Sequence, residues 1–210
     1  MPLLIAVAVS YMFGSIPVAL IAGHVLGGVD IRNTGSGNAG ATNLYRIFGL
    51  KAYVAVLAID ALKGFASAKW APLAAPAGFL DPLQLSILCG FAAVFGHIFS
   101  VFAGFKGGKG VATAAGVMLA VAPGQLMAAV AVYLLVVGLT NYVSLGSIGA
   151  ALSVPAWLAV SRFAFGTETR WEIYAVSVIL AALILATHRT NIKRLVKGEE
   201  LKTYFFKKRK

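Results

Sequence analysis

The sequence is poor in the residues on which soluble proteins and metalloenzymes depend. Of its 210 residues, 12% are charged and 60% are hydrophobic, whereas an ordinary soluble domain has ~25% charged residues. So few charges cannot cover a soluble surface, and the composition therefore indicates an integral membrane protein. The single cysteine, Cys89, excludes an intramolecular disulfide. One cysteine and three scattered histidines also lack the spacing of a metal site.

Long hydrophobic runs cover most of the chain, at 3–28, 52–74, 83–103, 111–138, 142–161 and 172–187. Backbone groups in hydrocarbon must be hydrogen-bonded within the chain, so we expect each run to be helical. The first run has no positive leader and no small-residue cleavage site, which favours a retained helix over a signal peptide. The run 111–138 is either one span or two short helices, because Pro123-Gly124 is a strong turn signal.

The positive charges favour two helices in that run. Cytoplasmic loops carry an excess of Lys and Arg. The segments 29–51 and 104–110 are basic, whereas Asp81 is the single charged residue in the segment 71–82. Nine of the eighteen Lys and Arg residues lie in the C-terminal tail after His188. Two short helices around Pro123-Gly124 keep this tail on the cytoplasmic side. We therefore predict an all-α integral membrane protein with seven transmembrane helices, its N-terminus outside and its C-terminus cytoplasmic.

This topology divides the chain into a single seven-helix membrane domain, residues 1–190, and a basic cytoplasmic tail, residues 191–210. A basic tail that follows a hydrophobic span is typical of contact with anionic lipid. We therefore expect membrane lipid, and no nucleic acid, as its partner. The loop 162–171 carries Arg162 and Arg170 and lies outside in this topology, against the charge rule.

Three polar stretches reach the predicted cytoplasmic side, and the first is RNTGSGNAGATNLYRIFG, residues 32–49. Its glycines let backbone N–H groups converge on an anion. Arg46 offers a guanidinium fork that matches phosphate. Further donors come from Ser36, Asn38, Thr42 and Asn43. The alternative interpretation is a flexible turn between two helices.

The second stretch is GFKGGKGVAT, residues 104–113, which is not a Walker A loop because Gly108-Lys109 is followed by Gly110. Its physics is similar to that of a phosphate loop. Gly107, Gly108 and Gly110 permit a close backbone approach, and Lys109 supplies a mobile cation. A helix that starts near residue 111 aims its N-terminal N–H groups at this loop. The alternative is a helix-breaking turn with two interfacial lysines.

The third stretch is THRTNIKRLVKGEE, residues 187–200. His188 and Asn191 share a face if the last helix continues through them; the alternative is a helix end that passes into a cationic tail. Ser144 and Ser147, near the inner end of the predicted helix 142–161, are further donors for an anion. Few carboxylates accompany the three stretches, so the site is rich in anion donors and poor in general bases. Such a site suits an activated, highly negative substrate, with catalysis by positioning and charge stabilisation.

Four motifs carry a resemblance to the bacterial acyl-phosphate-dependent glycerol-3-phosphate acyltransferases along nearly the whole chain. They are GSGNAGATNLYRIFG at 35–49, DALKG at 60–64, GHIFSVFAGFKGGKGVATAAG at 96–116 and HRTNIKRLVKGEE at 188–200. YVSLGSI at 142–148 is also similar to the family. Ser100 stands where the family usually has proline, and Thr187 and Thr190 replace the usual arginine and glutamate.

The resemblance implies an acyltransferase of the bacterial inner membrane with a cytoplasmic active site. Its substrates would be acyl phosphate and glycerol 3-phosphate, and its products 1-acylglycerol 3-phosphate and phosphate. We expect no cofactor, no metal and a monomer. The implied catalytic residues are Ser36, Lys109 and His188. The implied substrate-binding residues are Asn38, Ala41, Thr42, Asn43, Arg46, Gly107, Gly108, Gly110, Asn191, Ser144 and Ser147.

Two other functions remain open from the residues themselves. A transporter of phosphate-bearing solutes would also use glycine-broken helices whose ends face anions, although these patches cluster on one side and no inverted repeat is visible. A membrane scaffold would leave the anion-binding patches unexplained. The H-x-x-x-x-D box of other glycerolipid acyltransferases is absent, which argues against acyl-CoA or acyl carrier protein as the direct donor.

Overall fold

The computed structural model describes residues 2–70, 73 and 80–205, and this part of the chain is helical with no β-strand. It divides into two compact units, Met1–Pro123 and Gly124–Lys210, which are described separately below. The boundary falls at the Pro-Gly step that the sequence marks as a helix break. Most of the predicted outer segment 71–82 and the last five residues of the basic tail lie outside the described residues.

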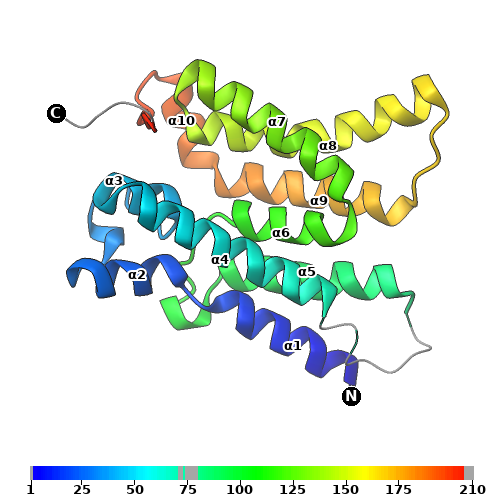
Figure 1. Ribbon diagram of the computed structural model, residues 1–210, viewed down its shortest axis with the longest axis horizontal. Helices are drawn as coiled ribbons and strands as arrows, with labels where there is room; N and C mark the ends of the chain where they lie inside the picture. The colour runs from blue at the N-terminus through cyan, green and yellow to red at the C-terminus, as the bar shows by residue number, and fades with distance from the viewer. Residues whose placement is uncertain (1, 71–72, 74–79, 206–210) are drawn as a thin grey trace. The chain divides into compact units, whose positions relative to one another are not determined.

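The described residues of unit 1 form α-helices joined by loops and short 3-10 turns (Figure 1). The elements are α1 (Pro2–Ser15), α2 (Val18–Gly27), η1 (Ile31–Asn33), α3 (Ala41–Phe48), α4 (Leu50–Lys69), α5 (Pro82–Ile98), η3 (Val101–Ala103) and α6 (Val111–Val121). The helix α1 packs beside α5, and α4 packs beside α6 (Figure 1). A buried cluster around Ile31, Leu44 and Val56 joins the turn η1 to α3 and α4.

Glycines let the helices of unit 1 approach each other closely. A Cβ added at Gly14 of α1 would overlap the backbone of Ala93 in α5, and one at Gly96 would overlap the backbone of Tyr11. At the other pair, a Cβ at Gly116 of α6 would overlap the carbonyl of Ala61 in α4. These contacts bring backbone against backbone, and they fix the end of α5 and the start of α6, between which the second polar stretch lies.

The predicted hydrophobic run 3–28 is interrupted after Ser15, so the expectation of one continuous helix is corrected. Pro17 has no N–H to donate into a continuing helix, and α2 starts afresh at Val18. The hydroxyl of buried Ser100 donates to the Ser15 carbonyl at this break. The φ of Ser100, −64°, is the value that proline fixes. The serine thus keeps a proline-like backbone and adds a hydrogen bond.

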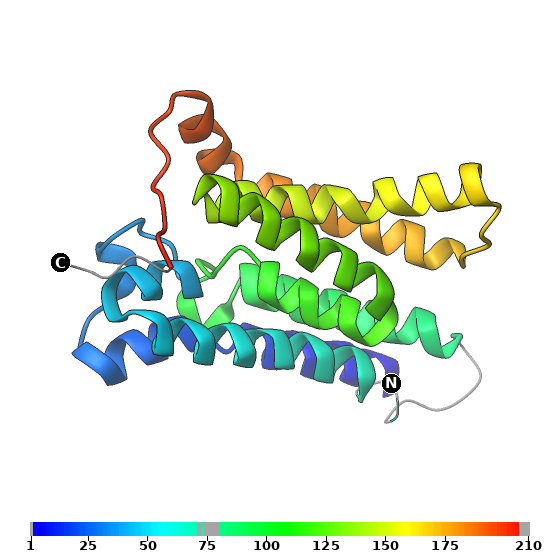
Figure 2. The same ribbon diagram turned by 45° about the horizontal axis from the view of Figure 1, so that its top comes forward.

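Unit 2 contains α7 (Pro123–Thr140), α8 (Val143–Phe165), α9 (Trp171–Thr187) and α10 (Arg189–Val196). The helices α8 and α9 pack together, and a 63° bend separates α9 from α10. Figure 2 shows the following segment leaving α10 in extended form. Its Thr203 N–H donates to the carbonyl of Asn141, between α7 and α8, at 2.8 Å.

Four helical segments of the described chain are long and apolar enough to cross a membrane: Leu3–Gly27, Pro82–Ala103, Pro123–Thr140 and Val143–Phe165. The bent pair of α9 and α10 is a fifth candidate. The helix α6 is apolar but has 11 residues, about 16 Å at 1.5 Å per residue, which is too short to cross alone. The helix α4 has 20 residues and carries Lys51, Asp60, Lys63 and Lys69. For the described residues, an all-helical membrane fold and the helix break at Ala122 are therefore confirmed. The expectation that both helices around Pro123-Gly124 are short is corrected, because α7 begins at Pro123 itself, runs on to Thr140 over 18 residues and is long enough to cross a membrane.

Candidate functional site

The first polar stretch is shaped by a fully buried side chain, Asn43, in the first turn of α3. Its amide nitrogen donates to the carbonyls of Ile31 at 2.7 Å and Thr34 at 3.0 Å. Its oxygen accepts the backbone N–H of Ser36 at 2.8 Å. Asn43 is a predicted substrate-binding residue, and all three of these hydrogen bonds direct its side chain into the loop. It therefore holds the loop that presents Ser36.

An ion pair that the sequence analysis missed closes the start of this loop. Arg32 Nη2 lies 2.6 Å from Asp30 Oδ2 and Arg32 Nε lies 3.0 Å from Oδ1, while Nη1 donates to the Ala103 carbonyl at 3.2 Å. The Arg32 guanidinium, together with the Arg32 backbone N–H, holds the pKa of Asp30 at about 2. Arg32 therefore connects the first loop to the turn η3, which leads into the second stretch.

The glycines of the second stretch pack against the end of α5. The N–H of Gly107 donates to the Ile98 carbonyl at 3.0 Å, and the N–H of Gly108 donates to the His97 carbonyl at 3.1 Å. These two amides are thus engaged within the protein. Gly110 has φ +82° and caps α6, a conformation that favours glycine. The amides of the first turn of α6, which follow Lys109, have no acceptor within the helix.

The first and second stretches meet at Gly108. A Cβ built there would lie 3.1 Å from the carbonyl oxygen of Ala39, on the first loop, and would overlap Nε2 of His97. The predicted site residues of unit 1 are therefore brought to one end of its helices. Ser36, Asn38, Ala41, Thr42, Arg46, Gly107 and Lys109 are half-buried, whereas Gly108 and Gly110 are buried.

Two predicted site residues of unit 2, Ser144 and Asn191, share the carboxylate of Glu200, a buried residue that the sequence analysis did not single out. Its Oε1 accepts the Ser144 hydroxyl at 2.9 Å and the Asn191 amide at 2.6 Å, and its Oε2 accepts Arg194 Nε at 2.9 Å. Ser147 donates to the carbonyl of its own helix at Val143. The side-chain donors of both serines are thus directed to protein acceptors, and Glu200 orients Asn191.

His188 lies at the bend between α9 and α10 and is 2% exposed. Its Nδ1 is 2.8 Å from the Ile184 carbonyl. A carbonyl only accepts hydrogen bonds, so Nδ1 carries a proton. The lone pair of the neutral imidazole is therefore on Nε2. The chain bends by 63° at His188, so the last membrane helix does not continue straight through it. His188 instead caps the start of α10, the helix that contains Asn191.

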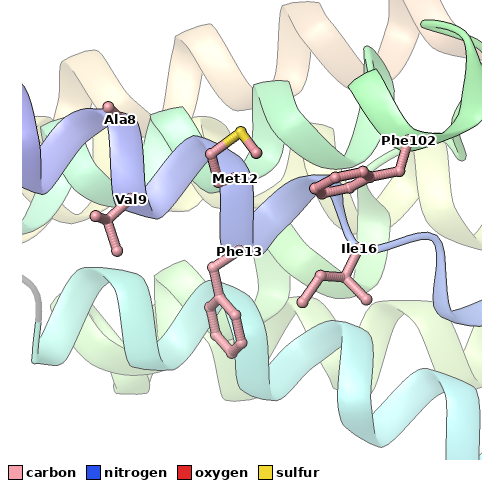
Figure 3. A pocket seen from close by; sticks show the side chains of 6 residues that line it. All are labelled: Ala8, Val9, Met12, Phe13, Ile16 and Phe102. Carbon is pink, nitrogen blue, oxygen red and sulfur yellow. The ribbon is translucent and has the colours of Figure 1, made fainter.

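Among the described residues, no three His, Cys, Asp or Glu side chains are arranged to hold a metal ion. An apolar groove of about 440 Å³ runs along α1 in unit 1, and Figure 3 shows its lining, with Phe102 of η3 at one end. The other lining residues are Ala8, Val9, Met12, Phe13 and Ile16. This lining offers hydrocarbon contacts and no charged side chain.

Comparison with known proteins matches residues 4–198 to the family model described as glycerol-3-phosphate acyltransferase. The chain is 42% identical to a glycerol-3-phosphate acyltransferase of Chlorobium phaeobacteroides, strain BS1, over 97% of both chains. A second such enzyme, from Chlorobaculum parvum, is also 42% identical, with 95% of each chain covered.

A crystal structure of PlsY, an integral membrane glycerol 3-phosphate acyltransferase, is similar in fold. In its glycerol 3-phosphate form it superposes with a TM-score of 0.83 at 38% identity, covering 97% of this chain and 96% of that one. A second crystal structure of PlsY, in the lysophosphatidic acid form, gives the same TM-score at 37% identity. From sequence and fold together, the chain belongs to the glycerol-3-phosphate acyltransferase family.

Proposed function

We propose that this protein transfers a fatty acyl group from acyl phosphate to the 1-hydroxyl of sn-glycerol 3-phosphate, the first acylation step of bacterial phospholipid synthesis. The products are 1-acylglycerol 3-phosphate and inorganic phosphate. Membership of the family supports the acceptor and the reaction class. It favours a transferase over the transporter of phosphate-bearing solutes that the residues alone leave open.

The contact of two polar loops at Ala39 and Gly108 is the observation that supports this function most. The loop that contains Ser36, which leads into α3, the helix of Arg46, thereby contacts the loop that contains Lys109. Two phosphate groups and a developing oxyanion need several cations and hydrogen-bond donors close together. Asp30, a carboxylate near these loops, is paired with Arg32, so it does not oppose an anionic ligand with an unpaired charge.

The reaction requires one bond exchange at the acyl carbonyl carbon. The 1-hydroxyl of glycerol 3-phosphate attacks this carbon, a C–O bond forms, and the bond from carbon to the phosphate oxygen breaks. Phosphate is a good leaving group, so no acyl-enzyme is needed. Ser36, Lys109 and His188 act as the catalytic residues, and Arg46 and Asn191 bind phosphate. Backbone groups at Ala41–Asn43 and around Gly110, with Asn38 and Thr42, complete the substrate site.

The hydroxyl proton goes either to a substrate phosphate oxygen or to His188. The second route fits the hydrogen bond of Nδ1 to the Ile184 carbonyl, which leaves Nε2 as the basic nitrogen. Replacement of His188 by Gln separates the two routes. Retained turnover with unchanged glycerol 3-phosphate binding supports transfer to the substrate, whereas loss of turnover with intact binding supports His188 as the base.

The membrane arrangement is part of the same proposal. Seven spans, with α4 and the short α6 among them, put both polar loops and the basic tail on the cytoplasmic side of the bacterial inner membrane. Acyl phosphate then enters from the bilayer with its phosphate at the cytoplasmic rim. The protein acts as a monomer with a single membrane domain over residues 1–190.

The test is phosphate release by the purified protein in detergent, given palmitoyl phosphate and glycerol 3-phosphate. Release should require both substrates and should fail when palmitoyl-CoA replaces palmitoyl phosphate. Lys109→Ala should abolish it, while Lys106→Ala, a change at an exposed lysine in the same loop, should retain it. Transfer from palmitoyl-CoA would overturn the proposed donor. Absence of transfer with folded protein that carries glycerol 3-phosphate across vesicle membranes would favour the transporter.

A further inference from the structure

Three buried ionisable side chains of unit 1 lie behind the second polar stretch. Asp60 and Lys63, one turn apart on α4, are each 2% exposed, and His97, in the last turn of α5, is 8% exposed. Lys63 Nζ is 2.8 Å from Asp60 Oδ1, and His97 Nδ1 is 3.5 Å from the same oxygen. One carboxylate oxygen therefore faces both the ammonium and the imidazole.

The imidazole of His97 contacts the loop that carries Lys109. Its Nε2 is packed so closely against Gly108 that a Cβ there would overlap it, and its Cε1 would lie 3.0 Å from that Cβ. The His97 carbonyl also accepts the Gly108 N–H at 3.1 Å. Gly108 is thus held between His97, through ring and backbone, and the Ala39 carbonyl of the first loop.

Lys63 connects the same cluster to the break between α1 and α2. Its Nζ donates to the Ile16 carbonyl at 3.1 Å, beside the position where Pro17 interrupts the hydrogen-bond pattern. The ammonium is thus a second donor to a carbonyl that also accepts the Val18 N–H at 3.0 Å, and it neutralises Asp60. The Asp60 carboxylate also faces Nδ1 of His97 across 3.5 Å, a charge contact without hydrogen-bond geometry, and its charge favours the ring orientation that points an Nδ1–H toward it.

A buried ion pair contributes little net stability compared with well-packed apolar residues, because desolvation of both charges offsets their attraction. Stability alone therefore gives a weak reason for this cluster. Orientation of the His97 ring gives a stronger reason for the cluster, since this ring packs against Gly108. Any rotation of that ring would move Gly108 and, with it, the neighbouring Lys109.

We propose that Asp60 and His97 are positioning residues for the acyl transfer: Asp60 orients the His97 ring, and the ring fixes Gly108 where the two substrate-binding loops meet. Lys63 supplies the charge that keeps Asp60 in place. This inference rests on the proposed function, since it gives the loop with Lys109 its working geometry. It assigns no contact with substrate to Asp60, Lys63 or His97.

The first experiment separates positioning from stability. Asp60→Asn combined with Lys63→Met removes both charges, so no charge of the pair is left buried alone. We expect this double variant to fold, with a melting temperature near that of the wild type, and to raise the KM for glycerol 3-phosphate at least tenfold. A purely structural ion pair predicts that the double variant has both the melting temperature and the KM of the wild type. A wild-type KM in the double variant would therefore overturn the proposal.

The second experiment uses the contact between His97 and Gly108. Gly108→Ala places a methyl group on Nε2 and should weaken glycerol 3-phosphate binding at least tenfold. His97→Asn keeps an N–H for Asp60 and removes the ring atoms Nε2 and Cε1, so it makes room for that methyl group. The combination of the two changes should bind glycerol 3-phosphate more tightly than Gly108→Ala alone. Additive losses would contradict the positioning role.

The control is His24→Asn, the same substitution at an exposed histidine of α2, which should leave KM and kcat unchanged.

Glycerol 3-phosphate binding to every variant is also measured by calorimetry, without an acyl donor. If the wild type binds glycerol 3-phosphate but transfers no acyl group, the proposed function fails, and the binding series still decides the role of His97. If transfer occurs and the variants bind like the wild type, only the positioning role fails.

Discussion

The side chain of Asn43 holds the backbone of Ser36, seven residues earlier, through a 2.8 Å hydrogen bond from the Ser36 N–H. The same side chain donates to the Ile31 and Thr34 carbonyls. Asn43 is fully buried, so these three hydrogen bonds have no competition from solvent. The position of Ser36 thus depends on an amide whose own donors and acceptor are all directed into the loop.

Asn43→Asp should reduce kcat/KM at least tenfold by displacing the loop that presents Ser36. The carboxylate keeps an acceptor for Ser36 but loses both donors, so the Ile31 and Thr34 carbonyls lose the side-chain hydrogen bonds that hold the loop, each worth about 0.5–1.5 kcal/mol. Steady-state kinetics with palmitoyl phosphate and glycerol 3-phosphate measure the effect. The matched control, Asn33→Asp at an exposed position, should be close to the wild type. Equal activity of both variants would show that the Asn43 donors do not set the loop.

Glu200→Ala should destabilise the protein by roughly 3–5 kcal/mol, the usual cost of breaking a buried charged pair. The Glu200 side chain is 4% exposed, and its loss leaves Ser144, Asn191 and Arg194 without their shared acceptor. Chemical unfolding in detergent micelles measures the change. Glu199→Ala, at the exposed neighbouring carboxylate, should alter stability by less than about 0.5 kcal/mol. Similar unfolding curves for the two variants would refute the role of Glu200.

Gly116→Ala should cost about 1–3 kcal/mol of stability through overpacking, because the added methyl group meets the Ala61 carbonyl on α4. A backbone carbonyl cannot rotate away as a side chain can, so α4 and α6 must separate. Gly124→Ala is the control, since a Cβ there meets nothing within 4 Å. Its melting temperature should match or exceed that of the wild type. A Gly116→Ala melting temperature as high as that of Gly124→Ala would contradict the close helix contact.

The pair of Asp30 and Arg32 should make stability depend on pH in the acidic range. The folded-state pKa of Asp30 is lowered to about 2 by Arg32, below an unfolded value of about 3.9. Its contribution is therefore complete above about pH 4 and is lost as the pH falls toward 2. Asp30→Asn should melt below the wild type at pH 5, and the two should converge near pH 2.

The chain has seven Asp and Glu residues in all. Few other carboxylates therefore titrate in the acidic range, and the contribution of Asp30 can be measured there. Glu168→Gln, at an exposed position, is the comparison and should show no such convergence. A constant difference between wild type and Asp30→Asn from pH 5 to pH 2 would count against the lowered pKa.

Much of the fold follows from local features that a sequence displays. The Pro123-Gly124 step predicted a helix break, and α6 ends at Val121 before it. The break at Pro17 was missed because the hydrophobic run continues across it without a change of composition. The short helix α3 was interpreted as a loop, since its polar residues outweigh the apolar face formed by Leu44 and Ile47.

The residues that organise the candidate site were harder to predict, because their partners are distant in the chain. Glu200 lies 56 residues from Ser144, and no spacing rule relates them. His97 and Asp60 belong to different helices, and their contact depends on how α4 and α5 pack. The sequence does indicate which residues offer donors to an anion. It does not indicate which donors another side chain already occupies, as for Asn43 and Ser144.

The pairing of Asp60 with Lys63 also affects the biogenesis of the helix that carries them. Partners one turn apart meet as soon as the helix forms, before any neighbouring helix is in place. A lone charge near the centre of an inserting helix costs about 2.5–3.5 kcal/mol, and the pair enters with a net charge of zero. A nascent α4 can thus be accepted by the insertion machinery with its ionisable groups already in place, and His97 joins them when α5 arrives.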